Sequence, residues 1–573
     1  MDNVFLRLPM AVLMTLLASC ASVSRREGAE QVQTLLGARV ADARVWNRDA
    51  TGADVDARVG QLVAAPLTPA SAQQVALLKN PRIAAEYARL GIAQADVVEA
   101  SRIGNPGFSG SAIKGGGASI ITTGLSLPLA DLLLLSSKRR FAEGEYVRAQ
   151  HLIAAELVSL AADVNQAWYE AAGAQQVAAM RDAVSRAAAA SADLAQRFYE
   201  AGNISALEFR LEQASASQAR IAATMARAES TRARLALNTR MGLSGEMAAH
   251  WQLDVPLAAP VVNEDALETL QSLARENRLD LLAARREVDL LGDALGIAKR
   301  WRLIGNIDIG VERERETDGN KLTGPTLSLA IPLFNQGQAA IARAEAQLEI
   351  SRADLARLEL QIDNDVRLGR ERVAAMRAIA EDYRANLVPQ REAIVRHQSE
   401  RNNYMLIGAF ELLLSKQQEF DAYEGYLDAV RDYWLARNDL ARAIGTALPS
   451  DVSINARVIG VDALLAPPED AGMGHMHHGG AMGDMPGMDH SGHAMSGAES
   501  GQDKAPSPPV GNAEHMDHSG HDMSATKSTP PTTEKEKKHP GEVDHSGHEM
   551  PNNDSVPSPV PVQSESNRSG EHP

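Results

Sequence analysis

Two stretches of the same design, "LSLPLADL" at 125–132 and "LSLAIPLFNQGQ" at 327–338, decide the fold. In each of them leucines alternate with small or polar residues, which is the period of two expected for a β-strand with one apolar face. Each stretch leads directly into a long segment with the apolar spacing of a helix. A strand followed by a long helix occurs twice in the chain, and this indicates an internal duplication.

The segments before these two stretches agree with a duplication. Each half begins with a helical pattern, at 69–102 and at 266–301. "NIDIGVERE" at 306–314 then alternates apolar residues with aspartate, glycine and glutamate, as a strand does. The matching region of the first half, 107–130, is rich in glycine, serine and threonine, and "KGGGAS" at 114–119 predicts a surface loop. We therefore expect two short strands in each half.

The segment after the first stretch predicts a very long helix. Apolar residues at spacings of three and four mark one face of it: Ile153, Leu157, Leu160, Val164 and Trp168. No proline occurs from 129 to 255, and we expect a helix from about 136 to 200, roughly 100 Å long at about 1.5 Å per residue. Such a length favours coiled-coil packing. "AGN" at 201–203 breaks the pattern, and a return helix is expected to about 242.

The second half repeats this pattern. A second long helix is expected from about 336 to 403, followed by a break at 407–408 and a return helix that ends at 444–445. Pro389 lies inside the long helix, where we expect a kink or local loosening. Each half is therefore predicted to contain a helix, two strands, a long helix, a tight turn and a return helix.

The net charge excludes one class of function. The 573 residues carry a net charge of −17, which argues against nucleic acid as the main partner.

Strands that alternate apolar and polar residues suit a sheet between lipid and a wet lumen. Four strands cannot close a barrel, and an open sheet edge is not tolerated in lipid, so strands in a membrane must be shared between subunits. Because the sequence has no nucleotide-binding loop or nucleophile triad, we expect no enzymatic activity.

The N-terminus has the pattern of an export signal. Arg7 precedes a short apolar stretch at 8–17, and the stretch ends in small residues. "LASC" at 17–20 resembles the bacterial lipobox, and Cys20 is the only cysteine of the chain. This resemblance implies acylation of Cys20 and stable membrane anchoring. Ala21 after the cysteine suggests the outer membrane, and the alternative is an ordinary signal peptide with a chance cysteine.

The C-terminal part has a different composition from the rest. After Pro467 large apolar residues nearly vanish, so this tail is expected to form no packed core. The pattern "DHSGHxM" occurs at 489–495, 517–523 and 544–550. Two histidines and a methionine joined by serine and glycine can fold round one metal ion. The tail therefore predicts repeated metal sites.

The ligand types indicate which metal. Imidazole binds copper, zinc and nickel, whereas thioether selects copper(I) or silver(I). The candidate ligands are Met473, His475, Met476, His477, His478, Met482, Met485, Met488, His490, His493, Met495, His515, Met516, His518, His521, Met523, His545, His548 and Met550. The mixture of His and Met without cysteine favours copper first and silver second. Zinc or nickel binding and a metal-free linker are the alternatives.

The duplicated pattern resembles the TolC family of outer-membrane efflux channels over about 69–446. The lipidated CusC-like and OprM-like subgroup is the most similar. The turns "RFYEAGNISALEFRLEQA" at 197–214 and "NYMLIGAFELLL" at 403–414 contribute to the resemblance, because the family has a glycine, then a hydroxyl or acidic residue, then leucines there. The resemblance implies that these turns are tips that contact a periplasmic adaptor protein. The matching positions are Gly202, Ser205, Leu207, Gly408, Glu411 and Leu413.

The resemblance implies a mainly α fold with a small β part. Long antiparallel coiled-coil helices would form an α-helical barrel, and four strands from each subunit of a homotrimer would form a twelve-stranded β-barrel. The adaptor would be driven by an inner-membrane pump of the RND type. The expected location is the outer membrane, with a lipid anchor and an extension into the periplasm.

These expectations give the following organisation. The segments are a signal peptide (1–19), an extended N-terminal arm (20–68), the first repeat (69–245), a linker (246–263), the second repeat (264–446), a connecting segment (447–466) and the metal-binding tail (467–573). Near the second tip, Glu392, Glu400 and Glu411 are interpreted as solvated helix charges, with an acidic constriction as the alternative.

The predicted function is export of copper(I) or silver(I) from the periplasm through the channel. A wide tunnel needs no specific site, so the cargo rests on the tail alone. One alternative is a channel for drugs or for type I secretion whose tail is incidental. The other is a periplasmic metal-binding coiled-coil scaffold without a pore.

Overall fold

The structure is a computed structural model of the chain. It describes residues 28–40, 43, 52–116, 118–303, 307–454, 457, 458, 460 and 461. The predicted signal peptide, Cys20 and all predicted metal ligands of the tail lie outside the described residues.

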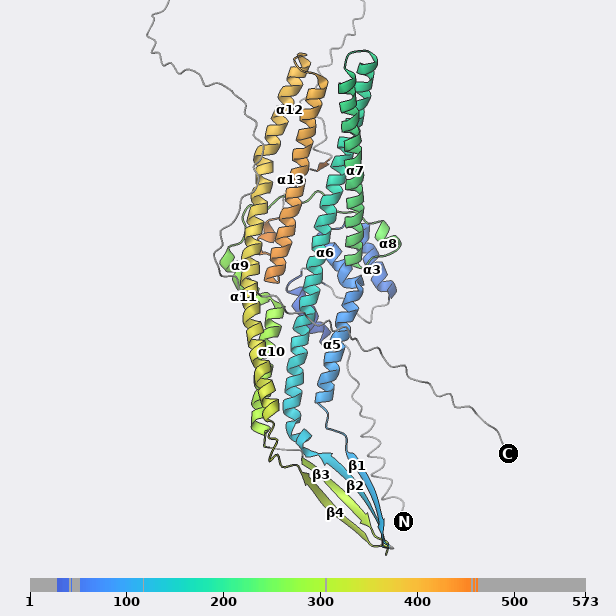
Figure 1. The fold of residues 1–573 in the computed structure, drawn as a ribbon, viewed down its shortest axis with the longest axis vertical. Coiled ribbons are helices and arrows are strands. Elements are labelled where there is room, and N and C mark those ends of the chain that lie inside the picture. Colours follow the sequence, from blue (N-terminus) through green and yellow to red (C-terminus); the bar gives the residue numbers. More distant parts are fainter. Residues whose placement is uncertain are drawn as a thin grey trace, which may run out of the picture. The chain divides into compact units, whose positions relative to one another are not determined.

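The described part of the chain is mainly helical and carries one small sheet (Figure 1). The first half contains α4 (Pro69–Lys79), α5 (Pro81–Ala100), β1 (Gly107–Gly115), β2 (Ala118–Pro128), α6 (Leu129–Glu200) and α7 (Ala206–Met241). The second half contains α9 (Leu267–Asn277), α10 (Leu279–Trp301), β3 (Ile307–Arg315), β4 (Lys321–Leu329), α11 (Gln338–Asp382), the π-helical turn η1 (Tyr383–Leu387), α12 (Val388–Asn403) and α13 (Ala409–Ile444). The other elements are α2 (Ala29–Gly37), α3 (Gly52–Ala64), α8 (Glu246–Ala249) and the 3₁₀ helix η2 (Pro449–Ser453). The predicted fold class and the order of elements are confirmed.

The helices form two long hairpins that pack against each other. α6 runs along α7, α11 and α12 run along α13, and α6 also contacts α13 and α10 (Figure 1). The predicted apolar face of α6 is buried, because Ile153, Leu157, Leu160, Val164 and Trp168 are each at most 4% exposed. In the described part of the chain, no helix is both long enough and apolar enough to cross a bilayer.

The first long helix begins earlier than expected. α6 starts at Leu129, directly after β2, and not near residue 136. The prediction was wrong here because the leucine-rich "LADLLLL" at 129–135 continues helical, after Pro128 in an extended conformation. The strand-like alternation therefore extends past the end of the strand in both stretches. Leu129 is the first residue of α6, and Ile331 lies beyond the end of β4.

The helix that opens each half is broken after its first 11 residues, where a single helix was expected. Asn80 has an extended backbone between α4 and α5, as the residue before a proline prefers. Its side chain accepts a hydrogen bond from the Arg82 N–H and so caps α5. Arg278 takes the same extended conformation between α9 and α10. The two breaks lie at matching places, which supports the duplication.

The N-terminal arm is partly helical, whereas an extended segment was predicted. α2 packs against α6, and α3 packs against α4. Val32 and Leu36 of α2 and Val59 of α3 are fully buried. Their spacing is that of a short amphipathic helix, and burial of this stripe explains why these segments are not extended.

The second long helix changes its winding before Pro389. The five residues of η1 are π-helical, and the Val388 N–H donates to the Tyr383 carbonyl. Pro389 then lies in the first turn of α12, where its missing N–H is tolerated. The local loosening predicted at this proline therefore takes the form of one π-helical turn.

Candidate functional site

The sheet is antiparallel, in the order β1-β2-β3-β4, and it has one apolar face. Residues paired in register share a face, and one such row is Phe108, Leu125, Val311 and Pro325. The same face carries Leu127, Ile307, Ile309, Leu327 and Leu329. Phe108 and Leu327 are 78% and 69% exposed, so described residues leave much of this face uncovered, whereas Leu127 and Ile307 are half-buried.

The opposite face of the sheet is mainly polar. It carries Ser109, Ser111, Thr122, Ser126, Asp308, Glu312, Glu314, Thr326 and Ser328. Ile113, Ile120 and Leu322 are the large apolar exceptions, and they lie near the turns. The alternation predicted from the sequence therefore produces a sheet with one face suited to lipid and one suited to water.

The sheet has two free edges within the described chain. Its register joins β1 to β2, β2 to β3 and β3 to β4. The outer edges of β1 and β4 thus present backbone N–H and C=O groups to which the described residues offer no strand. Such edges pair readily with another chain.

The first helical turn lies at the end of the α6–α7 hairpin remote from the sheet (Figure 1). Gly202 has φ +75°, and the Asn203 N–H donates to the Phe198 carbonyl at 2.8 Å, a turn that favours glycine. The Ser205 hydroxyl accepts from the Glu208 N–H at 3.2 Å, and the Glu208 carboxylate accepts from the Ser205 N–H at 2.7 Å. Hydrogen bonds from Ser205 to the carboxylate lower the pKa of Glu208. They fix the start of α7.

The second turn, between α12 and α13, is built differently. Met405 has φ +55° and takes the place in the turn that Gly202 takes in the first. The Leu406 N–H donates to the Arg401 carbonyl at 2.9 Å, in the same pattern as in the first turn. Gly408 precedes α13 and has no side chain with which to cap it. The Tyr404, Met405 and Leu406 side chains are 78%, 92% and 68% exposed.

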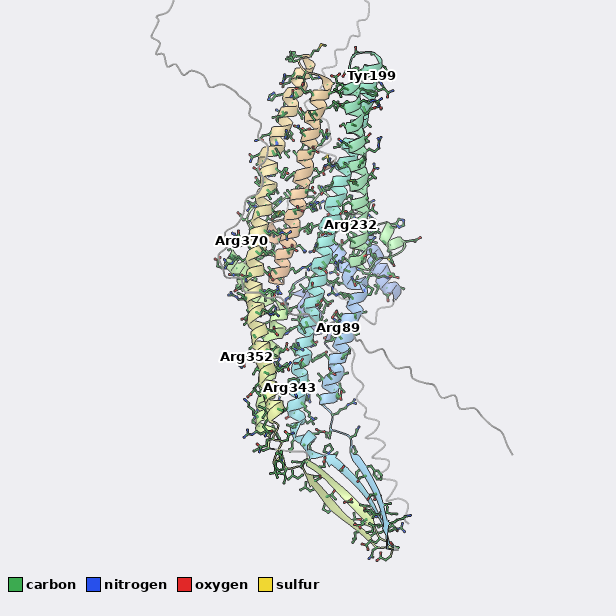
Figure 2. All side chains as sticks on the ribbon, in the orientation of Figure 1. Arg89, Tyr199, Arg232, Arg343, Arg352 and Arg370 are labelled. Atoms are coloured by element: carbon green, nitrogen blue, oxygen red, sulfur yellow. The ribbon has the colours of Figure 1, made fainter. Side chains whose placement is uncertain are left out.

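The two turns touch through aromatic side chains. The rings of Phe198 and Phe410 meet edge to face, with centroids 6.4 Å apart. Tyr199, labelled in Figure 2, stacks on Phe209 at 5.1 Å within the first hairpin. The two tips therefore form one composite surface, which includes the exposed Leu207.

The predicted tip residues are brought to this end of the helices, but not all are accessible. Leu207 is 69% exposed, whereas Leu413 is half-buried and its neighbour Leu414 is 57% exposed. Glu411 is exposed and lies in the first turn of α13. The exposed residues Tyr404, Met405 and Leu406 were not among the predicted positions. Three bulky residues in a turn sequence, "YMLIG", were the signal that could have identified them.

The three glutamates near the second tip do not converge within the described chain. Glu392 accepts from the Tyr423 hydroxyl at 2.5 Å, and this bond together with burial raises the pKa of Tyr423. Glu400 is exposed and lies 3.3 Å from the His397 ring nitrogen. Glu411 is exposed on the other helix of the hairpin. Glu400 and Glu411 are thus solvated charges, and Glu392 is tied to the neighbouring helix.

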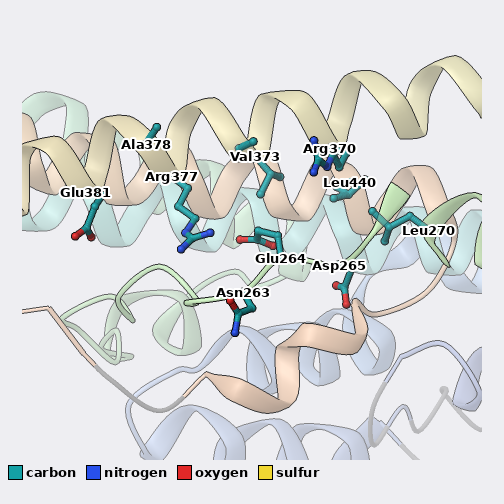
Figure 3. Close-up of a pocket in the computed structure, with 11 residues that line it drawn as sticks. Asn263, Glu264, Asp265, Leu270, Arg370, Val373, Arg377, Ala378, Glu381 and Leu440 are labelled. Atoms are coloured by element: carbon teal, nitrogen blue, oxygen red, sulfur yellow. The ribbon is translucent and has the colours of Figure 1, made fainter. Parts of the chain in front are cut away.

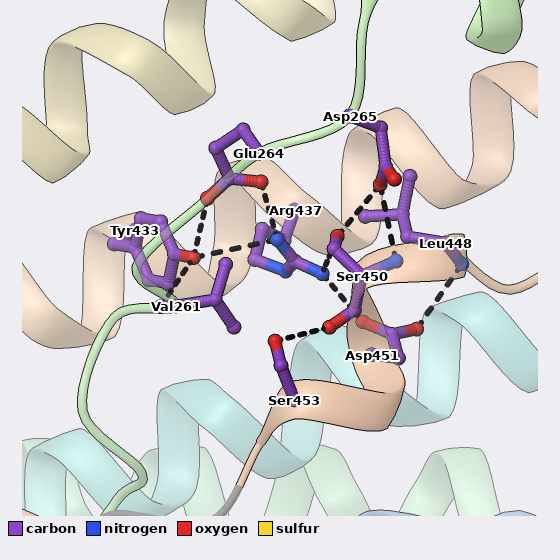
Figure 4. Close-up of polar contacts among 9 residues, drawn as sticks. All are labelled: Val261, Glu264, Asp265, Tyr433, Arg437, Leu448, Ser450, Asp451 and Ser453. Atoms are coloured by element: carbon purple, nitrogen blue, oxygen red, sulfur yellow. Dashed lines mark hydrogen bonds and ion pairs between the residues drawn. The ribbon is translucent and has the colours of Figure 1, made fainter.

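A buried polar network joins the end of α13 to the linker between the halves (Figure 4). Arg437 is 2% exposed and lies between Glu264 and Asp451, with its Nη2 atom 2.6 Å from Asp451. The Tyr433 hydroxyl donates to Glu264 at 2.6 Å and accepts from the Val261 N–H at 3.0 Å. Burial and this carboxylate raise the pKa of Tyr433. The network holds the linker against the middle of the helices.

The same linker borders a crevice beside α11 (Figure 3). The crevice has a volume of about 400 Å³, and the side chains of Asn263, Glu264, Arg370, Arg377 and Glu381 line it. The Glu264 carboxylate is engaged by Arg437 and Tyr433, and the Asp265 carboxylate, which also lines the crevice, accepts from the Ser450 hydroxyl. The crevice is therefore interpreted as a packing gap between α11 and the linker.

Metal binding is a property that the described residues do not display. Within the ranges that the structure describes, no group of three His, Cys, Asp or Glu side chains is placed to hold a metal ion. All the predicted ligands, from Met473 to Met550, lie outside these ranges.

Comparison with known proteins agrees with this arrangement. Residues 72–243 match the family model described as "Outer membrane efflux protein". No curated protein sequence matches the chain.

Solved structures share the fold at low sequence identity. A membrane protein from Pseudomonas aeruginosa has a TM-score of 0.57 at 20% identity, covering 71% of this chain and 98% of that one. The outer membrane protein VceC from Vibrio cholerae has a TM-score of 0.56 at 15% identity, covering 68% and 97%. CusC has a TM-score of 0.55 at 15% identity, covering 71% and 96%. At these identities the likeness establishes a shared fold.

Proposed function

We propose that this chain is one subunit of a homotrimeric outer-membrane channel in a tripartite efflux system, and that its cargo is copper(I) or silver(I). The sheet is the observation that best supports a channel. It has an apolar face, a polar face and two free edges, and its strands are 9 to 11 residues long. Strands of about 9–11 residues cross a bilayer. Three copies would join each β1 edge to a neighbouring β4 edge and close twelve strands round a wet lumen.

The helical hairpins fit the periplasmic part of such a channel. α6 has 72 residues, so at about 1.5 Å per residue it extends roughly 100 Å. Two hairpins of this kind from each of three subunits, in repeats 69–245 and 264–446, would line a tunnel below the membrane. The family match over 72–243 and the shared fold support this assignment. Nothing in this proposal requires a catalytic site.

The composite tip surface is the proposed contact for a periplasmic adaptor protein, which an RND-type inner-membrane pump would drive. Met405 supports this role because a left-handed backbone is strained for any residue with a side chain, and strain of this kind accumulates at functional sites. Its 92% exposed side chain, beside Tyr404 and Leu406, presents apolar surface that no described residue covers and that suits contact with a partner. A photo-reactive amino acid at position 405 should crosslink to the adaptor in cells, and one at the exposed Ile221 of α7 should not.

The composition of the tail is the basis for the proposed cargo. Its three "DHSGHxM" repeats combine imidazole and thioether groups, which suit copper(I) and silver(I). We place the tail in the periplasm, where it would collect metal for the pump or sequester it. Cys20 would carry the lipid anchor, which mass spectrometry of the mature N-terminus would detect directly.

Conductance separates a channel from a scaffold. The purified full-length protein should give large, stable conductance steps in planar lipid bilayers. A metal-binding scaffold without a pore would fractionate with membranes through its lipid anchor and give no steps.

Survival on graded copper and silver tests the cargo. The strains compared are the gene deletion, the deletion with the full-length protein, and the deletion with a version truncated after Ala466. Restoration by the full-length protein alone would show that the tail takes part in metal handling. Restoration by both versions would show that the channel exports metal and that the tail is auxiliary. If neither version restores tolerance although both are made and exported, a channel for drugs or polypeptides becomes the better assignment.

A further inference from the structure

The apolar face of the sheet ends in a group of cations at the end remote from the helices. This group, the basic rim, consists of Lys114 of β1, Arg313 and Arg315 of β3, and Lys321 of β4. The register places all four on the same face as Leu125 and the other exposed apolar residues. We propose that the basic rim binds the phosphate group of an anionic membrane lipid whose acyl chains lie on the apolar face. This inference rests on the proposed membrane location of the sheet.

The pairing of the rim residues favours a counter-charge. Arg315 and Lys321 lie directly opposite each other on β3 and β4. Like charges in a cross-strand pair are destabilising unless another group neutralises them. Arg313 lies on the same face one position further into the strand. Three cations therefore gather within two neighbouring strands.

The described residues do not neutralise these cations. All four rim side chains are exposed, and none forms an ion pair with a described carboxylate. The acidic residues of β3, Asp308, Glu312 and Glu314, all lie on the opposite face, and the last two alternate with the arginines. In the turn between β3 and β4, Asp318 accepts hydrogen bonds from the Asn320 backbone and side chain. The rim thus offers unpaired guanidinium and ammonium groups to a ligand.

The surface next to the rim identifies the ligand as a lipid. An apolar groove of about 720 Å³ runs over the face, lined among others by Leu125, Ile309, Val311 and Leu327. A soluble anion would use only the cations, whereas a lipid would use the cations for its headgroup and the groove for its chains. Guanidinium groups bind phosphate through two parallel hydrogen bonds, which suits Arg313 and Arg315.

The position of the rim agrees with the cost of charge in a membrane. Basic side chains facing lipid are costly at the bilayer centre and tolerated near the interface. The apolar rows from Ile307 to Val311 come first along β3, and the arginines follow at its far end. With the helices in the periplasm, this end of the sheet lies at the outer surface of the membrane. The rim would therefore hold lipid of the outer leaflet.

Lipid binding to the purified trimer tests this inference. Full-length protein in detergent micelles is mixed with phosphatidylglycerol or with phosphatidylcholine, and native mass spectrometry counts the bound lipids. The test variant is Arg313→Gln, Arg315→Gln, Lys321→Gln. The control variant, Arg343→Gln, Arg352→Gln, Arg367→Gln, makes the same charge change at exposed positions of α11, two of which are labelled in Figure 2. Trimer mass and circular dichroism confirm that each protein is folded.

The wild type and the control variant should prefer phosphatidylglycerol, and the test variant should lose roughly tenfold or more of that preference, since each basic residue near anionic lipid attracts it severalfold. Equal preference in the test variant and the wild type would overturn the inference. Displacement of the lipid by an equal concentration of inorganic phosphate would overturn it too, because it would indicate a site for free anions. A protein that forms pores in planar bilayers without any lipid preference contradicts only this inference, whereas a protein that forms no pores contradicts the proposed channel.

Discussion

The two halves of the chain share an order of elements but are held in shape by different interactions. In the first half, Thr68 and Ser205 cap α4 and α7 with their side chains, and the Asn80 amide donates to the Arg240 carbonyl at 2.7 Å. In the second half, Ala266 and Gly408 offer no side-chain cap. The comparison teaches that the duplicated topology follows from the spacing of helices and strands, whereas local capping is free to diverge.

The two halves hold the matching arginines of their return helices through different contacts. Arg437 of α13 pairs with Glu264 and Asp451, whereas Arg234, at the same distance from the end of α7, donates to the carbonyl of Trp251 at 2.7 Å. The Arg234 guanidinium also lies 3.8 Å from the centre of the Trp251 ring. One half therefore uses a buried ion-pair network where the other uses a carbonyl and an aromatic ring.

The largest expected difference between the halves concerns these two arginines. Arg437→Met should lower the free energy of unfolding by about 3–5 kcal/mol, because it leaves the Glu264 carboxylate buried without its partner. Arg234→Met should cost about 1–2 kcal/mol, since it removes hydrogen bonds to uncharged carbonyl groups and a cation–π contact. Urea unfolding of the purified protein followed by circular dichroism measures both. Equal losses would show that the network is not a special support of the second half.

The glycines that end the return helices should differ next. Gly242 and Gly445 both have positive φ, so alanine at either site carries the strain of a left-handed residue, about 1–2 kcal/mol. A Cβ at Gly242 would lie 2.7 Å from the Cα of Asn80, whereas one at Gly445 would lie 3.3 Å from the Cα of Arg278. We therefore expect Gly242→Ala to be more destabilising than Gly445→Ala in the same unfolding experiment. The reverse order would mean that the α4–α5 break yields more easily than the α9–α10 break.

Substitutions at the two tips should change local stability in opposite directions. Gly202→Ala should destabilise the first tip by about 1 kcal/mol, because its backbone is left-handed and no atom crowds the site. Met405→Gly should stabilise the second tip by up to about 1 kcal/mol, because it relieves the same strain. Hydrogen exchange of the tip amides would measure both effects. If Met405→Gly is stabilising but weakens efflux in cells, the strain at Met405 is maintained for function.

The smallest expected effect is a dependence of the second half on acid. Burial alone would raise the pKa of Asp280, but its hydrogen bonds with Arg278 and the charge of that residue outweigh burial and lower it. Because the pKa is lower in the folded state, Asp280 adds stability above its unfolded pKa of about 3.9, and this stability is lost as the pH falls through the folded value. Asp280→Asn should therefore flatten the loss of stability between about pH 5 and pH 3. Asp96→Asn on α5 is the matched control, and an equal effect there would refute this role for Asp280.

Much of the fold could be predicted from the sequence because it depends on periodicity. The apolar spacing from Ile153 to Trp168 identified the buried face of α6, and the alternation in "LSLPLADL" identified the apolar face of the sheet. The breaks at Asn80 and Arg278 were missed because the helical pattern continues across them, although proline at position 81 was a usable signal.

The contacts within the candidate site could be predicted only in part. The two turn motifs placed the tips correctly at one end of the helices, because each turn is a local structure. The partners of Arg437 lie in other segments, and Glu264 is 173 residues away, so no local pattern relates them. The exposure of Met405 and the half-burial of Leu413 depend on how the hairpins pack, which the spacing of leucines does not determine.

The free edges of the sheet have a consequence for how the protein is made. In water the edge groups of β1 and β4 are hydrated, whereas in a bilayer an unpaired edge would be left without hydrogen bonds. At the proposed membrane location a solitary chain would therefore have no stable inserted form, and insertion and assembly would be one concerted event. Its rate would rise steeply with the number of chains at one place. A lipid on each Cys20 would confine newly exported chains to two dimensions, so that even scarce chains meet before any strand enters the membrane.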